Sequence, residues 1–313
     1  MHHLDEATVA SLLDPAEMVD IIERALTDLG RGEADSTLRV RAKAGGAMAS
    51  AMAAVIPALG VSGGKIYSTT GNKFTFHVVL FDLAGDVLCT LDGAALTEVR
   101  TPALSAVAIR RMAPTKVETV ALLGTGREAL PHLEMLHREL APSQLRIWGR
   151  SPDRAESIAS AGRRFGASAE TFADADSAVE DADVVVTVTS SDQPLFDPAA
   201  LSARALVCAI GATKAERCEI PPEAVAAAAA VVADSSEGSR TECGDLIRAE
   251  QAGMFSWDQL IDFPDVLTGR VPVARSDESG PVIFESQGLA ILDVAAAAQA
   301  WSHHCGRLDP KEK

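Results

Sequence analysis

The chain has 313 residues, 47% of them hydrophobic, and a formal net charge of −16. This length suits two domains. The acidity argues against a nucleic-acid partner, because phosphate binding needs a basic surface. The five cysteines form no zinc or CxxC spacing, so we expect a reducing cytoplasm and no metal site. No apolar run is long enough to span a membrane, and we expect no membrane partner.

The first third of the chain reads as an α+β region. Asp14 and Pro15 form a helix start, and apolar residues recur from Met18 to Leu29 at helical spacing. Alternating patterns predict strands at 37–43, 63–68, 75–82 and 86–91, followed by a helix at 95–112. We expect these strands to form a mostly antiparallel sheet.

After residue 113 the pattern changes to buried strands that alternate with helical stretches. The predicted strands are 117–123, 145–149, 183–189, 205–210 and 230–233. This alternation predicts an α/β fold with a doubly wound parallel sheet. The stretch 261–281 is expected to be irregular, and 283–302 to be a short strand, a Ser-Gln-Gly turn and a helix.

A glycine turn joins the strand at 117–123 to the helical sequence that follows it. The turn reads GxGxxA and consists of Gly124, Thr125, Gly126, Arg127, Glu128 and Ala129. The first glycine permits a tight turn, the second lets the backbone approach a pyrophosphate, and the small last residue lets the helix pack on the strand. Because a strand precedes the turn and a helix follows it, we expect a dinucleotide here.

The end of the next strand bears on which dinucleotide binds. NAD sites place an Asp or Glu there for the ribose 2′-hydroxyl, whereas this chain has Gly149, Arg150 and Ser151. Arg150 and Ser151 could bind a 2′-phosphate, so we prefer NADP to NAD. The alternative for Arg150 is a solvated surface arginine.

Four basic residues outside the nucleotide domain suit a small anionic substrate: Arg39, Arg41, Lys65 and Arg100. Arg39 and Arg41 are expected on one face of a strand. Arginine can grip a carboxylate through two hydrogen bonds, and a lysine in a dry cleft can donate a proton. The alternative for each residue is a surface ion pair.

Several segments of this chain carry a family resemblance in their order and spacing. They are GGKIYS, LDGAALTEVRTPALSAVAIRRMA, ALLGTGREA, RIWGRSPDRAESIA, ADVVVTVTSSDQPLF, AIGATKAERCEI and ESQGLAILDVAAA. Together they resemble the ornithine cyclodeaminase/mu-crystallin family from about residue 37 to residue 300.

The resemblance implies a Rossmann domain at 114–283 and a substrate and dimerisation domain formed by 1–113 with 284–313. It implies a homodimer that handles small α-amino or α-imino acids with a nicotinamide cofactor. By position, Lys65 resembles the family's active-site lysine, Arg100 its carboxylate-binding arginine, and Arg41 (or else Arg39) its upstream arginine. His77 would either line the pocket or be a buried structural histidine.

Other matched positions are expected near the cofactor. They are Val188, Thr189 and Ser190 at the end of a parallel strand, and Ser286 and Gly288 in the turn before the last helix. Asp234 and the segment 242–245 are expected to cap helices or to edge the cleft.

One departure from the family pattern concerns the reaction. The cyclodeaminases carry an aspartate where this chain has Gly211-Ala212-Thr213. A threonine cannot take a proton from an amine as a carboxylate does, so we prefer reduction of a preformed cyclic imino acid, such as pyrroline- or piperideine-2-carboxylate. The alternatives are ornithine cyclodeaminase, an alanine- or opine-type dehydrogenase, and a non-catalytic protein that binds NADPH and a small ligand.

Overall fold

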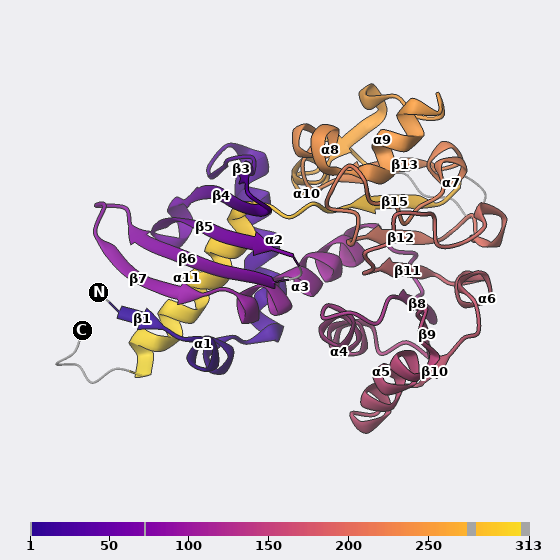
Figure 1. The fold of residues 1–313 in the computed structure, drawn as a ribbon, viewed down its shortest axis with the longest axis horizontal. Coiled ribbons are helices and arrows are strands. Elements are labelled where there is room, and N and C mark those ends of the chain that lie inside the picture. The colour runs from indigo at the N-terminus through magenta and orange to yellow at the C-terminus, as the bar shows by residue number, and fades with distance from the viewer. Residues whose placement is uncertain (1, 72, 274–279, 308–313) are drawn as a thin grey trace. The chain divides into compact units, whose positions relative to one another are not determined.

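The computed structural model describes residues 2–71, 73–273 and 280–307 (Figure 1). Contacts divide the chain into two units. Unit 1 is Met1–Leu104 with Leu289–Lys313, and unit 2 is Ser105–Gly288. The expected second boundary, at 283/284, would cut the strand β15 (Val282–Glu285), which belongs to the sheet of unit 2. Within the described residues, every helix is too short or too polar to cross a membrane.

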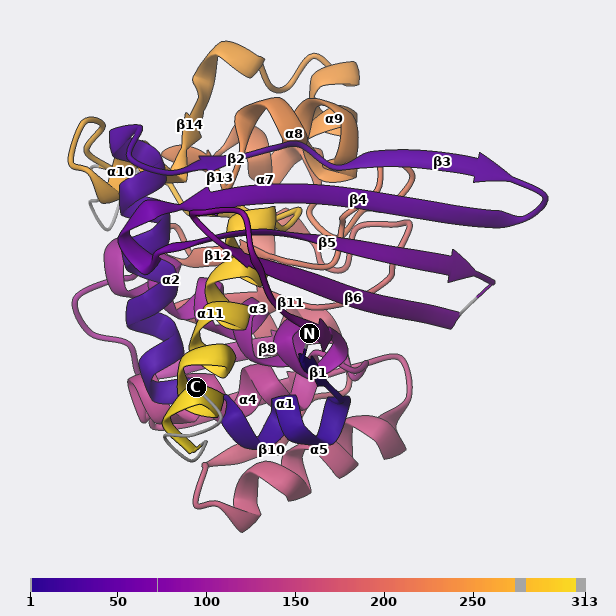
Figure 2. The same cartoon turned by 90° about the vertical axis from the view of Figure 1, so that its left-hand side faces the viewer.

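Unit 1 contains a sheet of seven strands in the order β1-β7-β6-β5-β4-β2, with β3 also paired to β4 (Figure 2). All pairs are antiparallel except β1 with β7. The strands are β1 (His2–Leu4), β2 (Asp35–Ser36), β3 (Val40–Ala44), β4 (Ala47–Ile56), β5 (Val61–Thr70), β6 (Lys73–Asp82) and β7 (Val87–Asp92). The mostly antiparallel sheet that the sequence predicts is confirmed.

The strand β4 was not predicted from the sequence. It reads AMASAMAAVI, and alanine is a weak strand former. These ten residues adopt a strand because β3 pairs with them on one side and β5 on the other. Met52, Ala54 and Ile56 point into the core, as the two-residue period of a strand requires.

Helices cover the inner face of this sheet. They are α1 (Glu6–Leu12), α2 (Pro15–Arg31), the start of α3 (Ala94–Met112) and α11 (Ala290–Arg307). A short 3₁₀ turn, η1 (Pro57–Leu59), connects β4 to β5. The predicted helix start is confirmed, because the Asp14 side chain accepts a hydrogen bond from the Ala16 amide at 2.8 Å. α11 lies along β4, β5 and β6 and packs against α2 (Figure 2).

Unit 2 contains eight parallel strands in the order β10-β9-β8-β11-β12-β15-β13-β14. They are β8 (Thr119–Leu123), β9 (Gln144–Trp148), β10 (Ala169–Thr171), β11 (Val184–Thr187), β12 (Leu206–Ala209), β13 (Ala230–Ala233), β14 (Leu260–Asp262) and β15. The doubly wound α/β fold is confirmed. The strand order reverses direction between β8 and β11, and such a switch point is where ligands bind in open α/β sheets.

The connections of unit 2 are helical. They are α4 (Ala129–Leu140), α5 (Pro152–Arg164), α6 (Ala175–Val179), α7 (Pro222–Ala226), α8 (Ser236–Glu242), α9 (Gly244–Gln251) and α10 (Phe263–Leu267), with η2 (Pro198–Ala200) and η3 (Trp257–Gln259). The stretch 261–281, expected to be irregular, contains the end of β14 and all of α10; residues 274–279 lie outside the described part.

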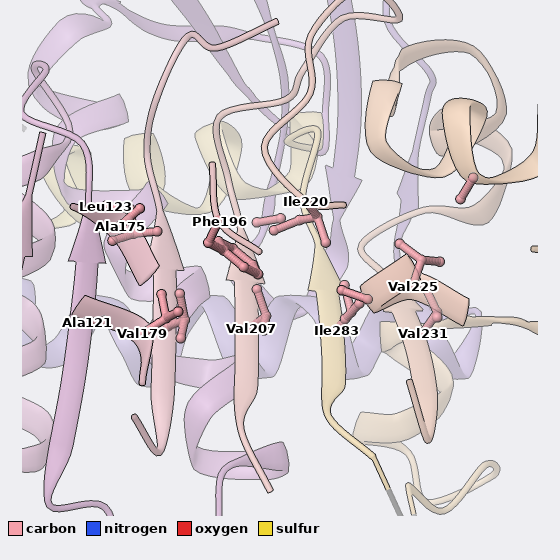
Figure 3. Packing of buried hydrophobic residues seen from close by; sticks show 14 of the residues in the cluster. Ala121, Leu123, Ala175, Val179, Phe196, Val207, Ile220, Val225, Val231 and Ile283 are labelled. Atoms are coloured by element: carbon pink, nitrogen blue, oxygen red, sulfur yellow. The ribbon is translucent and has the colours of Figure 1, made fainter. Parts of the chain in front are cut away.

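A buried apolar layer holds these elements on one face of the sheet. Figure 3 shows Leu123, Val207, Ile283 and Val231, from four different strands, as members of this layer, with Phe196 beside Val207. Because consecutive strands of a parallel sheet are covered on both faces, their residues are almost all apolar. In β8, β11 and β12, polar side chains therefore stand only at the strand ends.

Candidate active site

The glycine turn lies at the carboxyl end of β8, beside the switch point. Gly124 has φ +127°, and a Cβ added there would lie 2.8 Å from the Val188 carbonyl oxygen. A Cβ added at Gly126 would have its nearest neighbour, the same oxygen, at 4.0 Å. The first glycine is therefore required by the fold, whereas the second leaves open space over the backbone. Ala129 is fully buried where α4 begins, as the motif requires.

The next strand end is free of acidic residues between Trp148 and Ser151. Arg150 follows β9 and is exposed to solvent. The Ser151 hydroxyl caps α5 by accepting a hydrogen bond from the Arg154 amide at 3.4 Å. Gly149 packs closely on Thr125, because an added Cβ would lie 3.0 Å from the Thr125 Oγ1 atom. The two turns thus contact each other at one edge of the sheet.

A buried carboxylate, Glu219, ties together the ends of β11 and β12. It accepts hydrogen bonds from the Thr187 hydroxyl at 2.8 Å, the Thr189 amide at 2.6 Å and the Gly211 amide at 2.7 Å. Burial and the neighbouring Asp245 raise the pKa of Glu219 to about 7. This residue positions the backbone beside the glycine turn, and it was not among the residues predicted from the sequence.

Thr213 lies in the loop after β12. Its amide donates to the Gly211 carbonyl at 2.9 Å, and the segment 211–213 carries no carboxylate. Nearby, the Arg217 guanidinium donates to the Ser190 carbonyl. These contacts hold the loop against the segment that follows β11.

Asp234 organises the turn that precedes α11. Its Oδ2 atom accepts hydrogen bonds from the Ser286 hydroxyl at 2.9 Å, the Gln287 amide at 3.1 Å and the Gly288 amide at 2.7 Å. Ser286 is buried, and Gly288 has φ +82°. The Ser286 side chain therefore stabilises the turn through its hydrogen bond to Asp234, and Asp234 directly follows the carboxyl end of β13.

Further acidic groups are buried behind this edge. The ligand atoms of Cys243, Asp245 and Glu285 lie within 4.8 Å of one another. Burial raises the pKa of Asp245 to about 6 and, together with Asp245, raises that of Glu285 well above its usual value. A buried carboxylate that has no cation paired with it is neutralised most readily by binding a proton.

Unit 1 contains a buried cluster of opposite charges. Lys65 on β5 is 3% exposed, and its Nζ atom lies 2.8 Å from the Asp293 Oδ1 atom on α11. The same oxygen lies 3.3 Å from the Nε atom of Arg100 on α3. The Lys65 ammonium also donates to the Thr97 hydroxyl at 2.9 Å and lies 4.5 Å from the centre of the Phe76 ring. Lys65 and Arg100, expected separately, are thus brought together by a residue that was not expected.

The other candidates in unit 1 are placed differently. Arg39 precedes β3, and its charge acts on Lys65 and Asp293. Arg41 lies on β3 opposite Ser50, on the same inner face as Lys65. His77 is opposite Ile66 rather than Lys65, so it points to the outer face, where its half-exposed ring lies 3.1 Å from Asp92. His77 therefore neither adjoins Lys65 nor is buried.

A parallel sheet with this order and a glycine turn at its switch point defines a Rossmann-type dinucleotide-binding protein. The sequence model of the ornithine cyclodeaminase/mu-crystallin family matches residues 3–305. The chain therefore belongs to that family, and the resemblance noted from the sequence is confirmed.

Three similar proteins cover nearly the whole chain. Delta(1)-pyrroline-2-carboxylate/Delta(1)-piperideine-2-carboxylate reductase of Azospirillum brasilense is 32% identical over 95% of this chain and 94% of its own. The structure of a probable ornithine cyclodeaminase from Bordetella pertussis has a TM-score of 0.92 and 34% identity, covering 98% of each chain. Iminosuccinate reductase of Paracoccus denitrificans, in complex with NAD+, has a TM-score of 0.90 and 25% identity, covering 98% and 97% of the two chains.

Proposed function

We propose that the protein is an NAD(P)H-dependent reductase of a small cyclic imino acid of the pyrroline- or piperideine-2-carboxylate type. The observation that carries the proposal is the buried cluster in which Lys65 and Arg100 share Asp293. Two buried cations in a chain with a net charge of −16 suit a small carboxylate with a reactive nitrogen. The name of the Azospirillum relative supports the same substrate class.

The glycine turn would hold the coenzyme. The open space over Gly126 and the start of α4 suit a pyrophosphate, since free backbone N–H groups and the helix dipole favour an anion. When bound, the nicotinamide coenzyme supplies the hydride. Val188 and Thr189 at the end of β11, and Ser286 and Gly288 in the turn held by Asp234, would border it.

The residues of unit 1 would act on the substrate. Arg100 is proposed to bind the carboxylate, with Arg41 or Arg39 as the second arginine; the charge that Arg39 exerts at Lys65 favours Arg39. Lys65 would donate a proton to the imine nitrogen as the adjacent carbon accepts hydride. The imine thereby becomes a secondary amine, and Lys65 regains its proton from water.

NADPH is the preferred coenzyme in this proposal. Arg150 is exposed directly after β9, and residues 148–151 carry no acid that would repel a 2′-phosphate. The N-terminal end of α5, capped by Ser151, also favours an anion. The coenzyme NAD+ found with the Paracoccus protein is the alternative.

Thr213 distinguishes reduction from cyclodeamination. Cyclodeamination requires oxidation of an amine and so a group that accepts its proton, which the loop 211–213 does not provide. Reduction of a preformed imine needs only a carboxylate clamp, a proton and a hydride. We therefore favour reductase activity over the activity for which the Bordetella structure is named.

The decisive experiment compares two substrates. The protein is incubated with NADPH and pyrroline-2-carboxylate while nicotinamide absorbance is followed, and separately with ornithine and NAD+ while ammonia and proline are assayed. Net loss of NADPH with formation of proline is expected. Proline and ammonia without net coenzyme change would establish cyclodeamination instead, and coenzyme binding without either reaction would indicate a binding protein.

A variant pair tests the role of Lys65. Lys65→Met should lower kcat by about 10²–10⁴-fold, the usual contribution of a positioned proton donor. Lys43→Met is the control, because Lys43 is exposed on β3. Full turnover by the Lys65 variant would remove it from the mechanism.

We also propose a homodimer that pairs the outer faces of the unit 1 sheets. Val40, Val55 and Ile66 are 66%, 42% and 54% exposed. Val40 on β3 and Ile66 on β5 pair with Ala51 of β4 from its two sides, so they lie on the same face of the sheet. Sedimentation should give a dimer for the wild type and a monomer for Ile66→Asp. Leu83→Asp, in the β6–β7 turn, is the control and should remain dimeric; a wild-type monomer would refute the pairing.

A further inference from the structure

Asp293 is the anion at the centre of the unit 1 cluster. It lies in the first turn of α11 and is fully buried. Its Oδ1 atom contacts both Lys65 Nζ and Arg100 Nε. Its Oδ2 atom has no hydrogen-bond partner within the described residues. A fully buried carboxylate stays ionised only when neighbouring cations compensate the cost of its desolvation. The charges of Asp293, Lys65 and Arg100 therefore depend on one another.

The hydrogen bonds around Lys65 fix the direction of its amino group. The Thr97 hydroxyl donates its only hydrogen to the Gly93 carbonyl at 2.8 Å, so its oxygen must accept from Lys65. Asp293 takes a second hydrogen. An ammonium has three N–H donors, and two of them are therefore directed by α3 and α11. One N–H remains to be presented to a substrate.

The charges facing Lys65 come from three elements. Burial lowers the pKa of Lys65 to about 8; Asp293 from α11 raises it, whereas Arg100 from α3 and Arg39 from the segment before β3 lower it. Burial opposes ionisation of Asp293, but Arg100 and Lys65 together hold the pKa of Asp293 below its usual value. Asp293 is thus the anion that offsets the two guanidinium groups.

We propose that Asp293 is a positioning residue that keeps Lys65 in its ammonium form and directs its remaining N–H toward the substrate nitrogen. The consequence for catalysis rests on the proposed reductase function. There, Lys65 loses that proton to the nitrogen as hydride reaches the carbon, and Asp293 stabilises the ammonium that must form again before the next turnover. Asp293 itself keeps its charge throughout, holds its hydrogen bond to Lys65, and neither takes part in the proton transfer nor contacts the substrate.

The first arm of the test needs no substrate. The chain has seven lysines, so labelling lysine with ¹³C at Cε gives few resonances, and the one missing from Lys65→Met identifies Lys65. In Asp293→Asn the midpoint of the Lys65 titration should fall by about one to three pH units, which is the usual effect of removing an opposite charge in direct contact with the titrating group. Asp28→Asn, which alters another buried acid of unit 1, should leave it unchanged.

A second variant separates charge from packing. Asp293→Glu keeps the carboxylate, so its Lys65 midpoint should stay near the wild-type value even though the longer side chain misdirects the amino group. Equal midpoints in wild type and Asp293→Asn would overturn the proposal. Equal falls in the Asn and Glu variants would also overturn it, because packing rather than charge would then govern Lys65.

The second arm uses turnover. The alkaline limb of the kcat profile should move to lower pH in Asp293→Asn, and kcat should fall in Asp293→Glu without such a movement, while NADPH affinity stays unchanged in both. An unmoved limb would refute the catalytic part of the proposal. If the wild type reduces no imino acid, the proposed function fails, but the Lys65 titration still decides whether Asp293 controls the ammonium.

Discussion

The two glycines of the turn after β8 should respond differently to alanine. At Gly124, an added methyl group meets the Val188 carbonyl oxygen at 2.8 Å, and φ is +127°. The backbone strain costs about 1–3 kcal/mol and the crowding about 1–3 kcal/mol, so the loss is about 2–6 kcal/mol. With about 2–4 °C lost per kcal/mol for a unit of this size, Gly124→Ala should unfold roughly 4–24 °C below the wild type.

At Gly126, the protein itself should tolerate the methyl group. Its nearest neighbour would be 4.0 Å away, so Gly126→Ala should keep the wild-type melting temperature. The methyl would occupy space that a pyrophosphate needs, and losing one charge-assisted backbone hydrogen bond costs about 1.5–3 kcal/mol. The Kd for NADPH should therefore rise by about 10–100-fold.

Thermal unfolding and titration of nicotinamide fluorescence measure the two effects separately. Gly166→Ala, at a positive-φ glycine after α5 with no atoms near the added Cβ, controls for backbone strain without crowding or coenzyme. Wild-type NADPH affinity in Gly126→Ala would refute the assignment of the coenzyme pyrophosphate to this turn. An unchanged melting temperature in Gly124→Ala would refute the packing argument.

Three further outcomes are expected. Arg150→Ala should weaken NADPH binding about 10–100-fold, as loss of a charged hydrogen bond predicts, and should leave the Kd for NADH within about twofold of the wild-type value. Arg164→Ala, at the other end of α5, is the control. Equal losses of affinity for both coenzymes in Arg150→Ala would contradict a 2′-phosphate site. Glu219→Ala leaves one buried and two partly buried donors without their acceptor, and it should cost about 3–5 kcal/mol in chemical unfolding. Exposed Glu216→Ala should cost under about 0.5 kcal/mol, and similar losses in the two variants would show that Glu219 does not hold these strand ends. Burial raises the pKa of Glu219 to about 7 and that of Glu285 well above its usual value. The folded protein therefore keeps protons that the unfolded chain loses above about pH 4.5, and the free energy of unfolding should fall as pH rises toward 7. Glu285→Gln should flatten this pH dependence, and parallel stability–pH curves for the wild type and the variant would contradict it.

Local pattern was sufficient for the elements whose signals lie in neighbouring residues. The capped start of α2, the hairpin of β6 and β7, and the glycine turn between β8 and α4 could all be predicted, because propensity, capping and turn chemistry act over a few residues. The alternation of buried strands with helices was also enough for a doubly wound sheet.

Contacts between distant segments decided the rest. β4 is a strand because β3 and β5 pair with it, not because of its alanines. β15 enters the middle of the parallel sheet, between β12 and β13, although it follows them by many residues. Asp293 stands in an alanine-rich helix where nothing local marks it, and only the packing of α11 on β5 brings its carboxylate to Lys65. The basic residues could be named from the sequence because they stand among the apolar residues of predicted strands and a helix. The anion that organises them is determined by the tertiary fold, since ion pairing depends on distance in space and not along the chain.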